Sequence, residues 1–281
     1  MPLRFLHRAQ RPIVLGHRGA SASQPENTLR AFRQAMLDGA DGVELDVMRC
    51  GSGEVVVVHD DDLGRVTGGE AGSGIPVRTS SLADIRRYDV GRGERVPTLC
   101  EVLDALGPSA LVNIELKSRD VKTAAEHASL LADDGLAQEV ALMLRERRRT
   151  VGTTLVSSFD PFQLWRFRRA CGHHEVPMGF LFHRTQVMPL RQGWPARALP
   201  VVAVHPDAAL IDAVAMRRWR RRGLSVHAWT VDSPYEVDAL CALGVDAIIT
   251  NQPGAVRAHI DRARAASGPA APLLSSDHSP R

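Results

Sequence analysis

The stretch IVLGHRGASASQPENTLRAFRQAMLDGADGVELDV, residues 13–47, holds two apolar runs with a helical pattern between them. The runs IVLGH (13–17) and VELDV (43–47) are short and apolar, which is typical of buried parallel strands. Between them, apolar residues recur at helical spacing from residue 29 to 36. The order strand, helix, strand predicts a parallel βαβ unit, and its first strand delivers a histidine beside an arginine at its end.

The same alternation continues along the chain. Further strand-like runs lie at 111–116, 153–158, 177–182, 200–205, 224–230 and 246–250, and helices are expected near 98–106 and from 161, 208, 234 and 253. Eight strands alternating with helices predict an α/β fold, a TIM-type (β/α)8 barrel. The alternative is a doubly wound open sheet, but the sequence lacks the glycine-rich phosphate loops that such sheets often carry. Ser233 and Glu236 have the spacing of a capping box at the helix expected from 234.

A ninth apolar run, EVVVVHD (54–60), interrupts the alternation. Only six residues separate it from the run at 43–47, too few for a crossover helix, so we expect an antiparallel hairpin. A turn centred on the Ser52–Gly53 bond places Asp46 opposite His59. The hairpin therefore returns a second histidine to the level of the acidic residues of the second strand.

Composition indicates one ordinary globular domain, with 281 residues, 44% hydrophobic residues and a net charge of +3. We predict a single barrel domain over 1–266, a small insertion at about 48–98, and a flexible C-terminal tail over 267–281. No apolar run approaches the about 20 residues of a membrane-spanning helix, so no stable membrane insertion is expected. The N-terminus lacks the apolar core of a signal peptide, and we expect a cytoplasmic protein.

Cysteines and arginines carry little functional signal. The four cysteines are scattered without a C-x-x-C pair, which argues against zinc and structural disulfides. Two arginine-rich runs, 145–149 and 216–223, indicate solvated outer helix faces rather than a nucleic-acid surface. We therefore expect no nucleic-acid partner.

Polar residues gather at the ends of the predicted strands, and two residues that lie two positions apart on a strand point toward one face. They are His17 and Arg18 after the first strand, Glu44 and Asp46 on the second, His59 on the hairpin, and Glu115 and Lys117 on the third. The carboxyl ends of parallel barrel strands open on one rim, so these side chains are expected to converge there. His205, at the end of the sixth strand, is a further candidate for this rim.

The residue types in this group favour phosphodiester cleavage. Three convergent carboxylates are costly to bury without a cation, and oxygen ligands suit a hard ion, Mg²⁺ or Ca²⁺. Arg18 and Lys117 supply positive charge for a phosphate, and two histidines offer an acid and a base near neutral pH. Lys117 is one of only two lysines in the chain, and we expect it to contact phosphate or to organise Glu115 rather than to pair on the surface.

The chain resembles the glycerophosphodiester phosphodiesterase family from His17 to about Pro253. The resemblance rests on GHRGASASQPENT (16–28), GADGVELDVMRCGSGEVVVVHDDDLGRVTGG (39–69), VPTLCEVLDAL (96–106), LVNIELK (111–117), SSFDP (157–161) and VHAWTVD (226–232). It differs from the family pattern in lacking a proline before the His59–Asp60 pair and in ending the final strand with Thr250–Asn251, where many members have Thr–Asp.

The resemblance implies a TIM-type barrel that hydrolyses glycerophosphodiesters to glycerol 3-phosphate and an alcohol. The residues that match the family's motifs are then His17 and His59 as the acid/base pair, Glu44, Asp46 and Glu115 as ligands of one divalent ion, Arg18 and Lys117 as phosphate contacts, and Trp229 beside the substrate.

Two other functions remain open at this stage. A lysophospholipase D-like activity on a lipid-bearing diester would need an apolar wall, which Val187, Met188, Leu190 and Trp194 in the unassigned segment 183–199 offer. A non-catalytic binder of a phosphate ligand would keep the barrel without turnover. The sequence leaves open the alcohol group, the choice between Mg²⁺ and Ca²⁺, the oligomeric state and which histidine is the acid.

Overall fold

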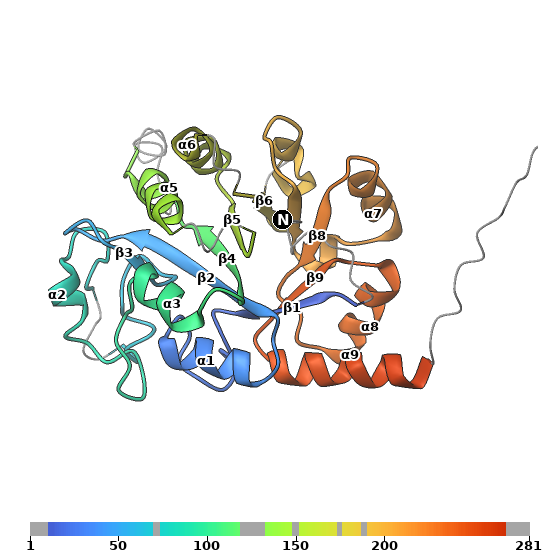
Figure 1. The fold of residues 1–281 in the computed structure, drawn as a ribbon, viewed down its shortest axis with the longest axis horizontal. Helices are drawn as coiled ribbons and strands as arrows, with labels where there is room; N and C mark the ends of the chain where they lie inside the picture. The colour runs from blue at the N-terminus through green and yellow to red at the C-terminus, as the bar shows by residue number, and fades with distance from the viewer. Residues whose placement is uncertain are drawn as a thin grey trace, which may run out of the picture.

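A computed structural model describes residues 11–69, 74–118, 133–147, 152–172, 176–186 and 190–267. Eight parallel strands close into a barrel with helices around it, which confirms the predicted TIM-type fold (Figure 1). The strands are β1 (Ile13–His17), β2 (Gly42–Arg49), β4 (Leu111–Leu116), β5 (Thr154–Ser158), β6 (Met178–Phe182), β7 (Ala203–Pro206), β8 (Ser225–Ala228) and β9 (Ala247–Thr250). β1 pairs with both β2 and β9, so the ring closes between the first and last strands.

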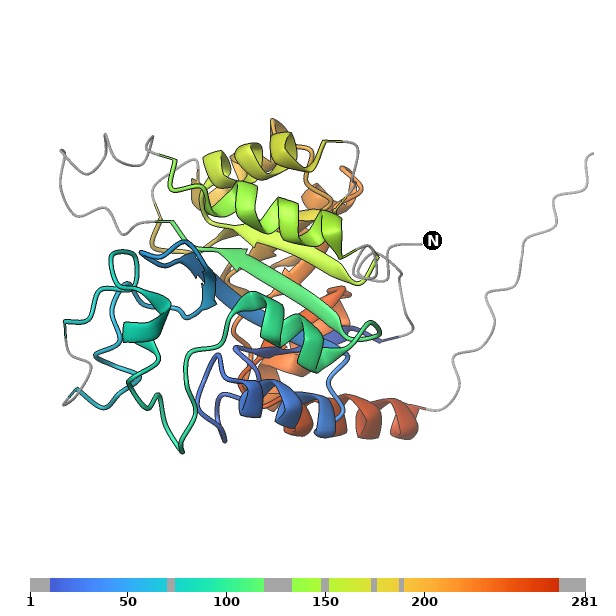
Figure 2. The same ribbon diagram turned by 60° about the vertical axis from the view of Figure 1, so that its left-hand side comes forward.

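The outer layer consists of helices and short turns. They are α1 (Leu29–Leu37), α2 (Leu82–Ile85), α3 (Leu99–Leu106), α5 (Leu136–Glu146), α6 (Pro161–Cys171), α7 (Ala213–Arg220), α8 (Pro234–Leu243) and α9 (Pro253–Ser267), with 3₁₀ turns η3 (Leu190–Gln192), η4 (Trp194–Arg197) and η5 (Ala208–Leu210). α9 lies beside the end of α1, where Arg257 donates to the carbonyl of Gly39 at 3.1 Å (Figure 2). Among the described helices, none has the length and apolar character that crossing a bilayer requires.

Capping residues set the helix starts, and two of them differ from our prediction. The capping box lies at Thr98 and Glu101, whereas Ser233 makes no side-chain cap. Asp207 caps only the short turn η5, and α7 begins after Asp212, whose carboxylate accepts from the amide of Ala215. The helix expected from residue 208 therefore starts at 213.

The register around the barrel arranges its inward side chains in layers contributed by alternate strands. The layer at the amino ends of the strands is small and apolar, and consists of Gly42, Leu155, Ala203 and Ala247. Two layers nearer the carboxyl ends are partly polar, and consist of Glu44, Ser157, His205 and Ile249, and of His17, Glu115, Leu181 and Trp229. Polarity thus increases toward the rim where the predicted site lies.

The hairpin between β2 and β3 (Val55–Val57) forms as predicted, but its register does not. Val47 pairs with Val57, and the amide of Val58 donates to the carbonyl of Asp46, so Asp46 faces Val58 and not His59. The loop has three residues, 51–53, because Cys50 pairs with Glu54, and Gly53 supplies the positive φ, 107°, that such a loop takes at its last residue. The predicted pairing of Asp46 with His59 is therefore wrong.

Residues after the hairpin pack against it as a small separate cluster. Their apolar side chains pack with Met48 of β2 and Val56 of β3, on the hairpin face that also carries Asp46, and include Leu63, Val77, Ile85, Val90 and Val96. Figure 1 shows this segment, with α2, on one side of the barrel. The predicted tail, 267–281, lies outside the described residues except for Ser267 at the end of α9.

The arginine-rich run 216–223 lies on α7 and just after it. Met216 and Trp219 are buried against the barrel, while Arg220 pairs with Asp246 at 2.7 Å and Arg222 donates to the carbonyl of Ala196 at 2.9 Å. Of the run 145–149, only the first three residues are described. The four cysteines are free thiols.

Candidate active site

Three carboxylates converge inside the carboxyl-terminal rim of the barrel. Glu44 and Asp46 lie on β2 and Glu115 on β4, and the strand register places Asp46 directly beside Glu115. One oxygen from each lies within 4.8 Å of the others, and the three residues are only 3%, 1% and 7% exposed. Water therefore contributes little to the stabilisation of their charge.

Two cations of the chain compensate part of this charge. Arg18 Nε lies 3.2 Å from Asp46 Oδ2, and Lys117 Nζ lies 3.1 Å from Glu115 Oε1 and 3.6 Å from Asp46 Oδ1. Lys117 therefore lies in the site beside Glu115. The pKa of Lys117 is raised, because the attraction of the two carboxylates for its ammonium exceeds the opposing effect of burial. Arg18 has a left-handed backbone with φ of 56°, which turns its amide to donate to Glu44 Oε2 at 3.0 Å.

The carboxylates differ in how well they are compensated. Burial, together with Asp46 and Glu115, raises the pKa of Glu44 well above its usual value, and burial also raises the pKa of Glu115. Burial acts on Asp46 in the same direction, but Lys117 and Arg18 outweigh it and lower the pKa of Asp46. Glu44, which no side-chain cation contacts in the described structure, is where additional positive charge would be most favourable. This all-oxygen donor set fits a hard divalent cation.

The two histidines have hydrogen-bond partners of different chemistry. His17 Nδ1 lies 2.7 Å from Asn251 Oδ1, a neutral amide, and burial together with Arg18 lowers the pKa of His17. His59 Nδ1 lies 2.6 Å from the carboxylate oxygen Oδ1 of Asp60. In each ring the other nitrogen, Nε2, is left for the site.

A salt-bridge chain connects His59 with Arg18. Asp60 Oδ2 accepts from Arg65 Nε at 2.6 Å, and both outer nitrogens of Arg65 donate to Glu26 at 2.7 and 2.8 Å. Glu26 in turn accepts from Arg18 Nη1 at 2.9 Å. Arg65, in the insertion after the hairpin, therefore connects His59 and Arg18 through one network of ion pairs.

These groups line a cavity of about 150 Å³. Its lining residues are His17, Arg18, Glu44, His59, Glu115, Lys117, Phe159, Leu181, Trp229 and Ile249. Phe159 and Trp229 form an apolar wall, with their rings edge to face at 5.5 Å. The cavity thus joins acids, cations, two histidines and an aromatic wall, a combination that suits a small phosphodiester.

Comparison with known proteins agrees with this geometry. Residues 17–255 match the family model described as the glycerophosphoryl diester phosphodiesterase family. The chain belongs to this family. A glycerophosphodiester phosphodiesterase of Caldanaerobacter subterraneus subsp. tengcongensis is 31% identical over 249 residues, which cover 86% of this chain and 94% of that protein.

Solved structures resemble this phosphodiesterase over most of its length. The glycerophosphodiester phosphodiesterase of Thermotoga maritima is 26% identical with a TM-score of 0.68, covering 89% of this chain and 99% of that one. A phosphodiesterase of Oleispira antarctica, solved in complex with the product sn-glycerol-3-phosphate, is 25% identical with a TM-score of 0.73, covering 89% and 97%. The chain is therefore a glycerophosphodiester phosphodiesterase with the barrel of its family.

Eight of the nine predicted site residues lie in or directly against the phosphodiesterase cavity, and His205 does not. His205 is fully buried in the layer beneath, with its ring tilted against that of His227 at 4.5 Å. A Cβ on Gly179 would approach His205 Nε2 to 2.4 Å, so the ring occupies space that this glycine leaves. The carbonyl of His205 accepts from Trp229 Nε1 at 2.8 Å, so His205 supports the cavity wall through its backbone.

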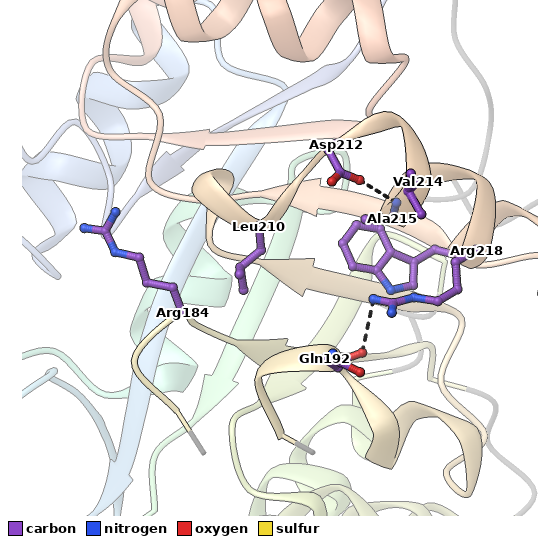
Figure 3. Close-up of a pocket in the computed structure, with 8 residues that line it drawn as sticks. Arg184, Gln192, Leu210, Asp212, Val214, Ala215 and Arg218 are labelled. Atoms are coloured by element: carbon purple, nitrogen blue, oxygen red, sulfur yellow. Dashed lines mark hydrogen bonds between the residues drawn. The ribbon is translucent and has the colours of Figure 1, made fainter. Parts of the chain in front are cut away.

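A second cavity of about 430 Å³ lies between the 3₁₀ turn η3 and α7 (Figure 3). It is lined by Arg184, Gln192, Leu210, Asp212, Val214, Ala215, Arg218 and Trp219. It is larger than the first, but it contains none of the carboxylates or histidines that the chemistry needs. We therefore place the active site of the phosphodiesterase in the smaller cavity.

Sequence reasoning missed the residues that orient the histidines. Asp60 follows His59 directly, so its adjacency was an available signal. Asn251 lies at the end of β9, where a barrel strand opens on the rim, but an uncharged amide stands out in no pattern of charges. Arg65 and Glu26 are connected only by the fold, because 39 residues separate them.

Proposed function

We propose that the chain hydrolyses glycerophosphodiesters to glycerol 3-phosphate and an alcohol, with one divalent cation and an acid/base pair of histidines. The observation that carries the proposal is the meeting of Glu44, Asp46 and Glu115 with two cations and two histidines around one small cavity. The sn-glycerol-3-phosphate bound in the Oleispira antarctica relative supports the product.

Glu44, Asp46 and Glu115 would hold the cation, magnesium or calcium. When bound, such an ion neutralises negative charge on the phosphate as a Lewis acid and lowers the pKa of an oxygen that it contacts. The three carboxylates would then remain ionised, because the positive charge of the ion would compensate the negative charges of Asp46 and Glu115 that raise the pKa of Glu44. Arg18 and Lys117 orient the phosphate by hydrogen bonding from the cavity wall.

The histidines differ in the group that their Nδ1 atoms contact. His59 is paired through Nδ1 with the carboxylate of Asp60, an arrangement that suits a general acid that protonates the departing alkoxide. The amide of Asn251 gives His17 no such charge compensation, and neighbouring Arg18 opposes protonation, so His17 is neutral and able to accept a proton. We therefore assign His17 as the base, which deprotonates water or a hydroxyl of the substrate, and His59 as the acid.

The test is release of glycerol 3-phosphate from glycerophosphocholine, measured with and without a chelator. We expect turnover with Mg²⁺ or Ca²⁺, loss of turnover in chelator, and recovery when the ion is returned in excess. Tight binding of glycerol 3-phosphate without any turnover would instead favour the non-catalytic binder.

The lysophospholipase D-like alternative has less support. Val187 and Met188 of the proposed apolar wall lie outside the described residues. Leu190 packs against the core, and Trp194, 45% exposed, lies under the guanidinium of Arg197, so neither lines the cavity. Comparing choline release from lysophosphatidylcholine with turnover of glycerophosphocholine tests this choice, and we expect the water-soluble diester to react faster.

A further inference from the structure

The hydrogen bond between His17 and Asn251 connects the first and last strands of the barrel. His17 Nδ1 lies 2.7 Å from Asn251 Oδ1. A neutral imidazole has one nitrogen that donates and one that accepts, so the partner of Nδ1 decides which role Nε2 has in the cavity. If Nδ1 donates, Nε2 carries a lone pair and can take a proton.

The orientation of the Asn251 amide is fixed by Asp232, in the loop after β8. Asn251 Nδ2 donates to Asp232 Oδ2 at 2.7 Å, and the Asn251 backbone amide donates to Asp232 Oδ1 at 2.8 Å. The hydroxyl of Thr250 donates to the same Oδ1 at 2.8 Å. A carboxylate only accepts, so the NH₂ group of Asn251 must face Asp232 and its oxygen must face His17.

The oxygen that faces His17 can only accept. Ser21 Oγ lies 2.8 Å from the same oxygen and 2.7 Å from the carbonyl oxygen of His17, and its one hydrogen can go to either acceptor, so it does not change the role of this oxygen. His17 Nδ1 must therefore carry the hydrogen. We propose that Asn251, held by Asp232, is a positioning residue that fixes the Nδ1–H tautomer of His17 and leaves the Nε2 lone pair for the base step.

This inference deepens the proposed function and rests on it for the role of His17. In the base step, Nε2 takes a proton from the attacking oxygen, and the Nδ1–H bond stays intact because an amide oxygen does not accept a second proton at neutral pH. The same proton leaves from Nε2 afterwards. The lowered pKa of His17, which comes from burial and from Arg18, agrees with a ring that is neutral before this step.

The tautomer is measured directly by two-bond ¹H–¹⁵N correlation spectra of the full chain with Mg²⁺, at a pH where His17 is neutral. The His17 signals are assigned by their loss in His17→Gln. We expect a protonated Nδ1 and a bare Nε2 in the wild-type protein. A bare Nδ1 in the wild type would overturn the proposal.

Four variants separate the tautomer from general damage. Asn251→Leu has similar size but no acceptor, and Asp232→Asn frees the amide to flip, so both should shift His17 toward Nε2–H. Asn251→Asp keeps an acceptor and should retain Nδ1–H. Ser21→Ala removes the hydroxyl beside the same oxygen but leaves Asp232 in place, so it is the matched control and should also retain Nδ1–H.

Kinetics and stability complete the test. We expect kcat of Asn251→Leu on glycerophosphocholine to fall about ten- to a hundredfold with little change in KM, which is less than the about 10²–10⁴-fold effect of losing a base altogether. Unchanged Nδ1–H in both Asn251→Leu and Asp232→Asn, each with a wild-type melting temperature, would overturn the inference. Absence of turnover in the wild type would overturn the proposed function instead, whatever the spectra show.

Discussion

Lys117 is the residue whose removal should affect stability and activity in different ways. Its ammonium contacts Glu115 and Asp46, and its side chain is 15% exposed. Removing one partner of a buried ion pair costs about 3–5 kcal/mol because the remaining charge is left uncompensated. Lys117→Ala should therefore lower the melting temperature in chelator, and Mg²⁺ should restore part of it. Turnover should stay strongly impaired at saturating Mg²⁺. If the melting temperature of this variant did not depend on Mg²⁺, the idea that Lys117 and the ion compensate the same carboxylates would be wrong.

Asp46 is expected to be a ligand of the divalent ion. Asp46→Asn removes one negative charge at constant size, so calorimetric titration with Mg²⁺ should show weaker binding and turnover should fall with it. Asp238→Asn is the control, because Asp238 is an exposed carboxylate paired only with His259 in the described structure. Full activity of Asp46→Asn in chelator would show that the reaction does not depend on the divalent ion.

The two histidines are distinguished by the leaving group. An alkoxide needs protonation to depart, so losing the acid should cost about 10²–10⁴-fold on glycerophosphocholine. A nitrophenolate leaves without protonation, and a nitrophenyl phosphodiester of glycerol should feel that loss far less. We expect kcat/KM of His59→Ala, and not of His17→Ala, to be rescued selectively by the activated substrate. Selective rescue of His17→Ala would reverse the two roles.

Charged side chains at strand ends could be predicted from the sequence because strand alternation and barrel topology decide where they point. Both carboxylates of β2 and the Glu115–Lys117 pair converge for this reason. The partners of the histidines follow from different physics. Asn251 is the partner of His17 because the fold places its uncharged amide at hydrogen-bond distance and in the right orientation. Neither the spacing nor the composition of the sequence indicates such a hydrogen bond.

At the scale of elements, Arg78 fastens the insertion to the barrel. It donates to Asp61 Oδ1 at 2.9 Å, to Asp134 Oδ2 at 2.7 Å and to the carbonyl of Lys117 at 3.2 Å, and its side chain is 11% exposed. The last bond lies at the end of β4, next to the active site. Arg78 thus links the segment that follows His59 to the strand that carries Glu115.

Arg78→Ala should lower the free energy of unfolding by about 2–4 kcal/mol, because several charge-assisted bonds are lost and Asp134 is left without its cation. Urea denaturation provides the measurement. Arg95→Ala, at an exposed arginine 4.0 Å from Asp89, should change stability by less than about 0.5 kcal/mol. Equal effects of the two substitutions would show that Arg78 is only a surface contact.

The elements themselves were predictable where their signals are local. The alternation of apolar runs and helical patterns located all eight barrel strands, and Asp160 followed by proline marked the start of α6. The hairpin register was predicted wrongly because the sequence around Gly53 suits a two-residue turn as well as a three-residue loop, and the structure has the three-residue loop. The start of α7 was missed because two aspartates, Asp207 and Asp212, both have the chemistry of a cap.

At the scale of the whole molecule, the buried His205 predicts how stability depends on pH. Its ring is fully buried, neither nitrogen has a hydrogen-bond partner among the described residues, and burial with neighbouring His227 lowers its pKa well below the usual value. The unfolded chain takes up a proton near pH 6.5 while the folded chain does not. Stability is therefore unaffected above that pH and falls as the pH decreases below it.

His205→Gln removes this titration. Its stability relative to the wild type should rise by about 1.4 kcal/mol per pH unit below about pH 6.5, measured by urea denaturation. At pH 8 the difference in unfolding free energy between His205→Gln and the wild type reflects only the change in packing, so it serves as the internal reference. A stability difference that is the same at pH 8 and pH 5 would mean that His205 takes up its proton in the folded protein as well.

The barrel closes through parallel pairing of β1 with β9, and this closure also brings His17 to Asn251 across 234 residues of sequence. During translation, every proposed ligand of the metal ion has been synthesised by residue 115, less than halfway along the chain. The partner that sets the protonation pattern of His17 is synthesised more than a hundred residues later. A chain that stops before residue 251 would therefore contain every proposed ligand of the metal ion but would lack the proposed partner of His17.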